Sequence, residues 1–221
     1  MPMPPALHNA LHLIKHQGWT AFTWLGDSGL LLPVAALITL WLAASRRTWP
    51  TALLWLVLFG AGSMAVLVSK LAFIGWGIGI ASLDFTGFSG HSALAASVWP
   101  VVLWLLASRA PHWTRVSLVC LGALLAAGIG VSRLVLDAHS PSEVIAGLAL
   151  GWAVSGAFLV LQRRQGHPSL RGTLVAVSLM LLAALRDPGV PAPTQNLLER
   201  IAVRLSGAER PYTREDLRAR R

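Results

Sequence analysis

Six apolar runs, separated by short polar segments, dominate the sequence. They cover residues 28–44, 51–69, 91–107, 113–131, 144–161 and 170–185, and the third and sixth of them are short. Most approach the ~20 residues that a helix needs to cross the hydrocarbon core of a bilayer, and lipid offers no partner to an exposed backbone group. The pattern therefore predicts an all-α, polytopic membrane bundle of about six transmembrane helices. A soluble all-α bundle would need polar outer faces, which these runs lack.

The composition supports a membrane protein. Hydrophobic residues make up 55% of the 221 residues and charged residues only 12%, whereas a soluble domain carries about 25% charge. Ten Trp against one Tyr fits a chain that meets membrane interfaces. These values exclude a disordered chain and argue against an ordinary cytosolic domain. The single cysteine, Cys120, excludes an internal disulfide framework and a cysteine-based zinc site.

The segments outside the core divide the chain further. The predicted parts are an N-terminal interfacial helix (1–27), a core of five spans (28–161), a loop with a sixth span (162–185) and a charged C-terminal tail (186–221). Leu7, Leu11 and Ile14 share one face of a helix, which favours a position on the membrane surface for the N-terminal segment. In the tail, residues 195–205 are predicted to form a short amphipathic helix, and the charged residues 209–221 to be mobile.

Charge asymmetry predicts the orientation. The first, third and fifth loops, together with the adjoining ends of the runs, contain seven basic residues and no acidic ones: Arg46, Arg47, Arg109, Arg115, Arg163, Arg164 and Arg171. The positive-inside rule places these loops in the cytoplasm, so both termini and the loops 70–90 and 132–143 face outward. The tail opposes this assignment with eight Arg against five acids, but it is partly neutralised and lies mostly far from the spans. The net charge of +9 is thus explained by membrane orientation, and no nucleic-acid partner is expected.

Polar residues at membrane depth are costly and mark functional sites, and nearly all of them lie in the two outward loops. The candidates are Lys70, Ser89, Gly90, His91, Arg133, His139 and Glu143. Lys70 and Arg133 supply positive charge for phosphate oxygens, and Gly90 stands at a helix start, where free N–H groups bind anions. Two histidines can act as nucleophile, base or acid at neutral pH. Together these features describe phosphoryl transfer through a phosphohistidine.

The spacing of His139 and Glu143 supports a catalytic role for this histidine. Glu143 follows His139 by four residues, so at a helix start its carboxylate can accept the imidazole N–H and fix the tautomer. Each residue taken alone has an ordinary explanation: a lysine near a helix end commonly extends to the interface, and a histidine can serve as a helix cap. Their concentration on one predicted face favours a single pocket.

Two short segments of the chain resemble the signatures of a known family. Ser89-Gly90-His91 and Ser132-Arg133-x5-His139-x3-Glu143 are similar to the second and third signatures, P-S-G-H and S-R-x5-H-x3-D, of the type 2 phosphatidic acid phosphatase superfamily, which is related to the vanadium haloperoxidase fold. The resemblance covers residues 24–161. It implies that His139 attacks phosphorus, that Glu143 orients His139, and that His91 protonates the leaving oxygen. It further implies that Lys70, Ser89, Gly90 and Arg133 hold the phosphate, without a metal or other cofactor.

The sequence departs from the family pattern at the first signature, K-x6-R-P. Lys70 begins it, but Gly77 and Ile78 stand where Arg and Pro are expected, so one phosphate-binding cation is missing. Phe88 replaces the Pro of the second signature, and Glu143 carries one methylene more than Asp. These changes leave three possibilities open: weak activity, an Arg supplied by the tail, or an unusual substrate.

The resulting expectation is a multi-pass phosphatase of the bacterial inner membrane, with its site at the periplasmic face and a lipid phosphate or diphosphate as substrate. Phosphatidic acid, phosphatidylglycerophosphate, undecaprenyl diphosphate and lipid A phosphate all remain candidates. The alternatives are a phosphotransferase that uses the same histidine and a non-catalytic lipid-binding or scaffold protein. The oligomeric state is left open.

Overall fold

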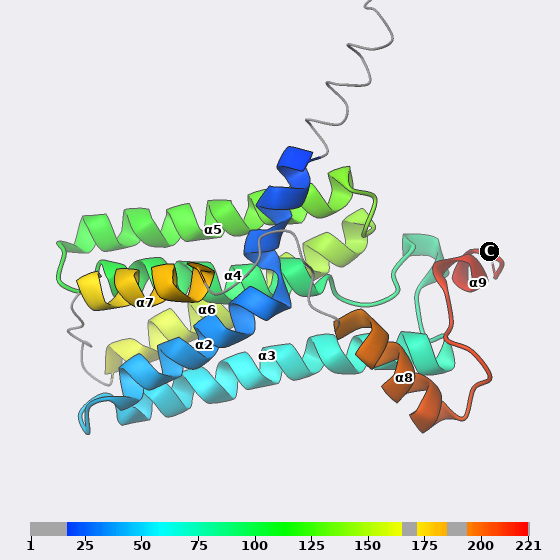
Figure 1. The fold of residues 1–221 in the computed structure, drawn as a ribbon, viewed down its shortest axis with the longest axis horizontal. Coiled ribbons are helices and arrows are strands. Elements are labelled where there is room, and N and C mark those ends of the chain that lie inside the picture. Colours follow the sequence, from blue (N-terminus) through cyan, green and yellow to red (C-terminus); the bar gives the residue numbers. More distant parts are fainter. Residues whose placement is uncertain (1–16, 165–171, 185–193, 221) are drawn as a thin grey trace, which may run out of the picture.

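The computed structural model describes residues 17–164, 172–184 and 194–220 (Figure 1). The helices are α2 (Ser28–Ala43), α3 (Trp49–Trp76), α4 (Gly90–Leu106), α5 (His112–Val135), α6 (Pro141–Leu161), α7 (Gly172–Ala184), α8 (Thr194–Ser206) and α9 (Arg214–Arg218). Three short 3-10 turns accompany them, at Trp24–Gly26, Ala81–Leu83 and Gln162–Arg164. The predicted all-α bundle is confirmed, and the described residues of the six apolar runs coincide closely with the helices α2 to α7.

The helices differ in how well their length suits a membrane. Four stretches within the described residues are long and apolar enough to cross one: Gln17–Ala43, Trp49–Trp76, His112–Val135 and Pro141–Arg164. Helices α4 and α7, which hold the third and sixth runs, are shorter, with 17 and 13 residues. The first apolar stretch begins before residue 28, because a helix over residues 17–23 and a 3-10 turn lead into α2. Residues 1–16, on which most of the interfacial-helix prediction rests, lie outside the described residues.

Helix α4 is the centre of the bundle. It packs against α2, α3, α5, α6 and α7, and most of its side chains are buried. Around it, the ring of Phe158 meets those of Trp55 and Trp104 edge-on, at centroid distances of 5.4 and 6.1 Å. The buried Trp55 donates its Nε1–H to the carbonyl of Ala35 at 3.0 Å, which joins α3 to α2 and satisfies the only polar atom of the indole.

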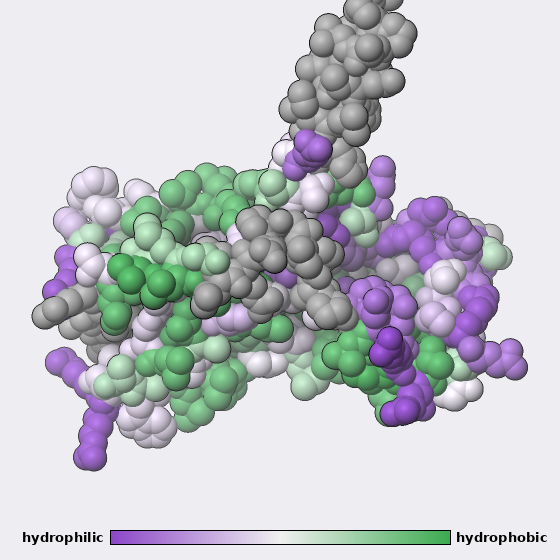
Figure 2. Space-filling model, viewed as in Figure 1, coloured by the Kyte–Doolittle hydropathy of each residue, from purple (hydrophilic) through white to green (hydrophobic). Residues whose placement is uncertain are grey.

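The outer surface of the bundle is apolar along its sides. Leu56 and Val57 on α3 and Leu124 on α5 are exposed, as expected for side chains that face lipid. Figure 2 shows hydrophobic side chains over the flanks of the helices, with hydrophilic side chains gathered at the two ends. This distribution is typical of a helical bundle that crosses a membrane.

A close approach between α6 and α4 brings the starts of these two helices together. A Cβ atom at Gly147 would lie 2.7 Å from the carbonyl oxygen of Ser89, so a residue with a side chain would push the helices apart. The backbone N–H of Ser89 donates to the carbonyl of Glu143 at 3.1 Å. Consequently the Ser89-Gly90-His91 segment lies directly against the first turn of α6.

The C-terminal tail lies at this same end of the bundle. Gly172, the first residue of α7, approaches the carbonyl of Leu106 at the far end of α4, whereas Thr194 of α8 contacts the hydroxyl of Ser28 at 3.4 Å. The chain therefore passes from the far end back to the end where α2, α4 and α6 begin, and Figure 1 shows α8 and α9 there beside the end of α3. Helix α8 covers residues 195–205, for which the sequence predicted a short amphipathic helix.

The prediction that residues 209–221 are mobile is wrong for the residues described, 209–220. Leu217 of α9 is buried in a small hydrophobic cluster with Phe73, Ile74 and Ala202. The N–H of Tyr212 also donates to the carbonyl of Ile74 at 2.9 Å. The composition of this charged segment did not reveal its packing, because only one leucine, Leu217, makes the apolar contact.

Candidate active site

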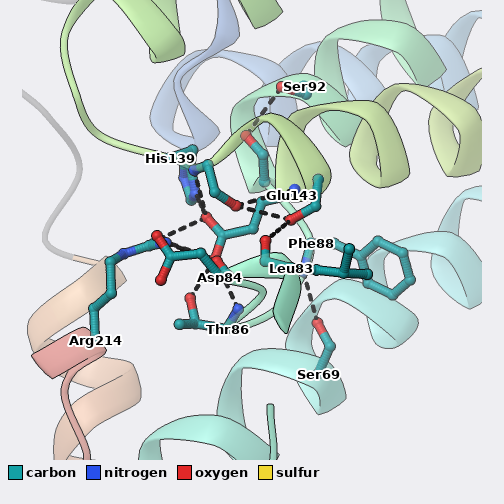
Figure 3. Close-up of polar contacts among 12 residues, drawn as sticks. Ser69, Leu83, Asp84, Thr86, Phe88, Ser92, His139, Glu143 and Arg214 are labelled. Atoms are coloured by element: carbon teal, nitrogen blue, oxygen red, sulfur yellow. Dashed lines mark hydrogen bonds and ion pairs between the residues drawn. The ribbon is translucent and has the colours of Figure 1, made fainter. Parts of the chain in front are cut away.

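The loops that join α3 to α4 and α5 to α6 meet at one end of the bundle, and Glu143 lies between them (Figure 3). Glu143 occupies the first turn of α6, where it forms a capping box with Ser140. Its side chain is fully buried. A buried carboxylate needs several donors to offset the loss of water, and here the surrounding loops supply them.

His139 makes a short contact with Glu143. Its Nδ1 atom lies 2.6 Å from Oε2 of Glu143, the contact that the spacing of four residues predicted. With the proton on Nδ1 donated to the carboxylate, Nε2 carries the free lone pair. Burial lowers the pKa of His139 below its ordinary value, although the hydrogen bond to Glu143 acts in the opposite direction. The imidazole is thus held neutral, in the tautomer that a nucleophilic Nε2 requires.

The other oxygen of Glu143 is fixed by the loop before α4. The backbone N–H of Thr86 donates to Oε1 at 2.8 Å, and the hydroxyl of Thr86 donates to the same atom. A further hydroxyl, that of Ser142, donates to the carbonyl of Leu83 at 2.8 Å and holds the loop against α6. These bonds fix the carboxylate before any substrate is present.

A cavity of about 780 Å³ opens beside His139. Five of the seven predicted site residues line it: Lys70, Gly90, His91, Arg133 and His139. The remaining two, Ser89 and Glu143, are fully buried next to it. The structure thus brings together all seven residues, which come from four helices and two loops.

Cationic groups and a helix start face this cavity. Gly90 is the first residue of α4, and Lys70 reaches into the cavity from α3. Arg133 donates from Nη1 to the hydroxyl of Thr23 at 3.2 Å, while its buried Nε has no hydrogen-bond partner within the part of the chain described. Buried donors are almost always paired, so an unpaired guanidinium N–H at a cavity wall points to an anionic ligand.

His91 lies in the first turn of α4. Its Nε2 atom is 3.8 Å from Oδ2 of Asp27, the residue that caps α2 by accepting from the N–H of Gly29 at 2.7 Å. Asp27 was not among the predicted site residues, and its carboxylate lies close enough to help orient the imidazole of His91.

Sequence reasoning also missed two contributors, Asp84 and Arg214. Arg214, from α9, binds both oxygens of Glu143, with Nη2 at 2.9 Å from Oε1 and 2.8 Å from Oε2. Asp84 adopts a left-handed backbone conformation in the loop and pairs with Arg214 and Arg218. The hydrogen bond from Arg218, followed by that from Arg214, lowers the pKa of Asp84 to about 2. The absence of an arginine at position 77, within the first signature, had suggested that the tail supplies one. No spacing rule, however, identified which tail arginine it would be.

The fold and this pocket define a membrane protein with a histidine–carboxylate pair in a cationic cavity, and comparison with known proteins agrees. Residues 80–167 match the PAP2 superfamily. The chain is 31% identical over 157 residues to phosphatidylglycerophosphatase B of Bacillus subtilis strain 168, an alignment that covers 66% of this chain and 76% of that protein. The chain belongs to the PAP2 superfamily, as the two sequence signatures predicted.

Two further comparisons agree with this membership. The crystal structure of a transmembrane PAP2 type phosphatidylglycerolphosphate phosphatase from Bacillus subtilis matches with a TM-score of 0.54 and 25% identity, covering 74% of this chain and 80% of that one. An uncharacterized 22.5 kDa protein in the cps region of Klebsiella pneumoniae is 47% identical over 202 residues, which are 90% of this chain and 97% of that protein. With its apolar helices and this transmembrane neighbour, the chain is a multi-pass membrane protein.

Proposed function

We propose that this protein is a lipid phosphate or diphosphate phosphatase that works through a phosphohistidine on His139. The observation that carries the proposal is the His139–Glu143 contact of 2.6 Å at the wall of a cavity that Lys70 and Arg133 also line. A neutral, oriented imidazole beside cations is the arrangement that attack on a phosphate needs, because the cations neutralise the anion that would otherwise repel the nucleophile.

The proposed reaction has two steps. In the first, Nε2 of His139 bonds to phosphorus, the bond from phosphorus to the lipid oxygen breaks, and His91 gives its proton to that oxygen. In the second, a water molecule gives a proton to His91 and attacks phosphorus, the bond to Nε2 breaks, and inorganic phosphate leaves. His91 thus acts first as acid and then as base, and the enzyme returns to its starting state.

The phosphate would be held by groups that do not react. Arg133 and Lys70 would bind its oxygens from α5 and α3, and the N–H groups at the start of α4, next to Ser89 and Gly90, would bind a third side. The charge of the transferred group is therefore balanced by side chains. This supports the prediction of a metal-independent enzyme, which an assay with EDTA tests.

The cavity favours a substrate with a lipid tail. Apolar side chains of four helices line it, among them Leu32 of α2, Leu67 of α3 and Leu197 of α8. A charged headgroup at the histidines and a hydrocarbon chain along these side chains would satisfy both parts of the cavity. Because the relatives include phosphatidylglycerophosphatase B, phosphatidylglycerophosphate is the first substrate to test.

The site is proposed to face the periplasm across the bacterial inner membrane. The support comes from the arginine-rich loops, which follow α2, α4 and α6 and therefore lie at the opposite end from His139. Those loops carry the charge that marks a cytoplasmic face. A periplasmic site would act on lipid phosphates in the outer leaflet.

Phosphate release by the purified, detergent-solubilised protein tests the function. The panel contains phosphatidylglycerophosphate, phosphatidic acid, undecaprenyl diphosphate and lipid A phosphate, each with and without EDTA, and His139→Ala serves as the control. We expect release from at least one lipid that EDTA leaves unchanged and His139→Ala abolishes. Transfer of labelled phosphate to an added alcohol without release would favour a phosphotransferase, and the absence of both would favour a non-catalytic lipid-binding protein.

A further inference from the structure

Arg214 connects the C-terminal tail to the residues around the nucleophile. Its Nη1 donates to the backbone carbonyl of Asp84 at 2.8 Å and lies 3.0 Å from Oδ2 of the same residue. Its Nη2 binds both oxygens of Glu143. The side chain is 27% exposed and lines the cavity, whereas the carboxylate that it contacts is fully buried. Figure 3 shows the side chains of Arg214 and His139 both reaching the carboxylate of Glu143.

The tail is held in place independently of this ion pair. Leu217 is buried against α3 and α8, and the N–H of Tyr212 donates to Ile74. Arg220 donates from Nη1 to the carbonyl of Gly77 at 2.9 Å. Gly77 has a φ of +65°, and a Cβ atom on it would lie 2.7 Å from Nη2 of Arg220. The tail therefore fills the space over Gly77, the position where the sequence lacks the expected arginine.

We propose, on the basis of the function proposed above, that Arg214 is a positioning residue that acts on His139 through Glu143. Both side chains contact the same oxygen: Oε2 of Glu143 lies 2.6 Å from Nδ1 of His139 and 2.8 Å from Nη2 of Arg214. A guanidinium bound to both oxygens fixes the rotation of the carboxylate, and its charge makes that carboxylate a weaker base. The proton then stays on Nδ1, and Nε2 stays free for attack.

The charge of Arg214 also affects the protonation of His139. The titratable or charged groups around this imidazole come from five helices: Lys70 of α3, His91 of α4, Arg133 of α5, Glu143 of α6 and Arg214 of α9. Cations disfavour the imidazolium and the carboxylate favours it. Removing Arg214 deletes one cation and leaves Glu143 fully available to His139, so the pKa of His139 should rise.

Titration of His139 tests this without requiring turnover. We would follow the imidazole by NMR in detergent micelles, using histidine-labelled full-length protein and assigning the signal by its loss in His139→Ala. Arg214→Gln should raise the pKa of His139, and Arg214→Lys, which keeps the charge, should leave it near the original value. The matched control is Arg204→Gln, which removes an exposed tail charge on α8 that faces solvent. An equal pKa in Arg214→Gln and in the unmodified protein would overturn the proposal.

Kinetics on whichever lipid is hydrolysed give a second measurement. Loss of a group that orients a reacting side chain costs on the order of 10–100-fold in activity, and we expect this loss in kcat with little change in KM. Guanidinium ion added to Arg214→Ala should restore part of kcat, an effect that a purely structural role would not produce. A rise in KM with kcat unchanged would contradict the positioning role. The absence of rescue in an Arg214→Ala variant that folds would contradict it as well. An unmodified protein that releases no phosphate would refute the proposed function, while the titration would still decide the role of Arg214.

Discussion

Glu143 accepts from the imidazole of His139 at 2.6 Å, across the junction where a loop becomes α6. The same carboxylate accepts from the backbone N–H of Ser140 at 3.2 Å as part of the capping box. One side chain therefore starts the helix and orients the histidine. Because both tasks use carboxylate oxygens as acceptors, an amide, which offers only one acceptor oxygen, should disturb the histidine more than its size suggests.

Glu143→Gln is predicted to lower kcat by on the order of 10³–10⁴-fold. The amide keeps the shape of the side chain, but its NH₂ group is a hydrogen-bond donor. In one orientation this group faces the donor Nδ1–H of His139, and in the other it faces the donor guanidinium of Arg214. Glu143→Asp keeps the charge, so its kcat should lie between those of Glu143→Gln and the unmodified protein. Its shorter side chain cannot reach Thr86, Arg214 and His139 equally well. Both are checked by steady-state kinetics alongside thermal unfolding in detergent. Equal activity of Glu143→Gln and the unmodified protein would show that Glu143 does not orient the nucleophile.

His91→Ala should have a different effect, because it leaves the nucleophile intact and removes only the proton for the leaving oxygen. Positioned proton transfer contributes ~10²–10⁴-fold. We expect a loss in this range on a phosphate monoester with an alkoxide leaving group. With p-nitrophenyl phosphate, or with a diphosphate, the loss should shrink, because these groups leave without a proton. Comparing the variant on a poor and a good leaving group checks this, and an equal loss on both would remove His91 from the role of acid.

The pH dependence should reflect the lowered pKa of His139, which burial produces. A nucleophilic imidazole must be neutral, and a lowered pKa keeps it neutral to lower pH. The acid-side fall of kcat/KM should therefore lie below pH ~6.5, the ordinary value for histidine. A profile of kcat/KM from pH 4 to 9, with buffers of constant ionic strength, measures it. An acid limb clearly above that value would mean that another group, or a protonated His139, controls the reaction.

Orientation can be tested by cysteine labelling in intact cells. In a Cys120→Ala background, Ser82→Cys places an exposed thiol in the loop beside the site, and Arg164→Cys places one in an arginine-rich loop at the other end. A membrane-impermeant maleimide should label only the first, and both after the cells are lysed. The reverse pattern would put the site in the cytoplasm and contradict the positive-inside argument.

The sequence predicts the fold and the centre of the site well, because both depend on local patterns. The apolar runs predicted the positions of α2 to α7, and the four-residue spacing of His139 and Glu143 matched their contact. Gly147 allows α6 to approach Ser89 closely, which brings the two signature segments together.

The tail could not be placed in the same way. Its contacts join residues far apart in the chain, such as Arg214 with Glu143 and Leu217 with Phe73. A charged segment with one leucine has the composition of a mobile end, and only the fold shows that this leucine packs against α3 and α8. The pairing of His91 with Asp27 likewise depends on how α2 packs against α4.

The central claim is that phosphate passes through His139, and trapping that intermediate tests it most directly. The protein would be mixed briefly with a lipid substrate carrying ³²P in its phosphate, quenched in alkali, where phosphohistidine survives, and digested for mass spectrometry. We predict an acid-labile label on the peptide that contains His139, present in His91→Ala and absent from His139→Ala. Label on another residue, or label that persists in His139→Ala, would contradict the mechanism.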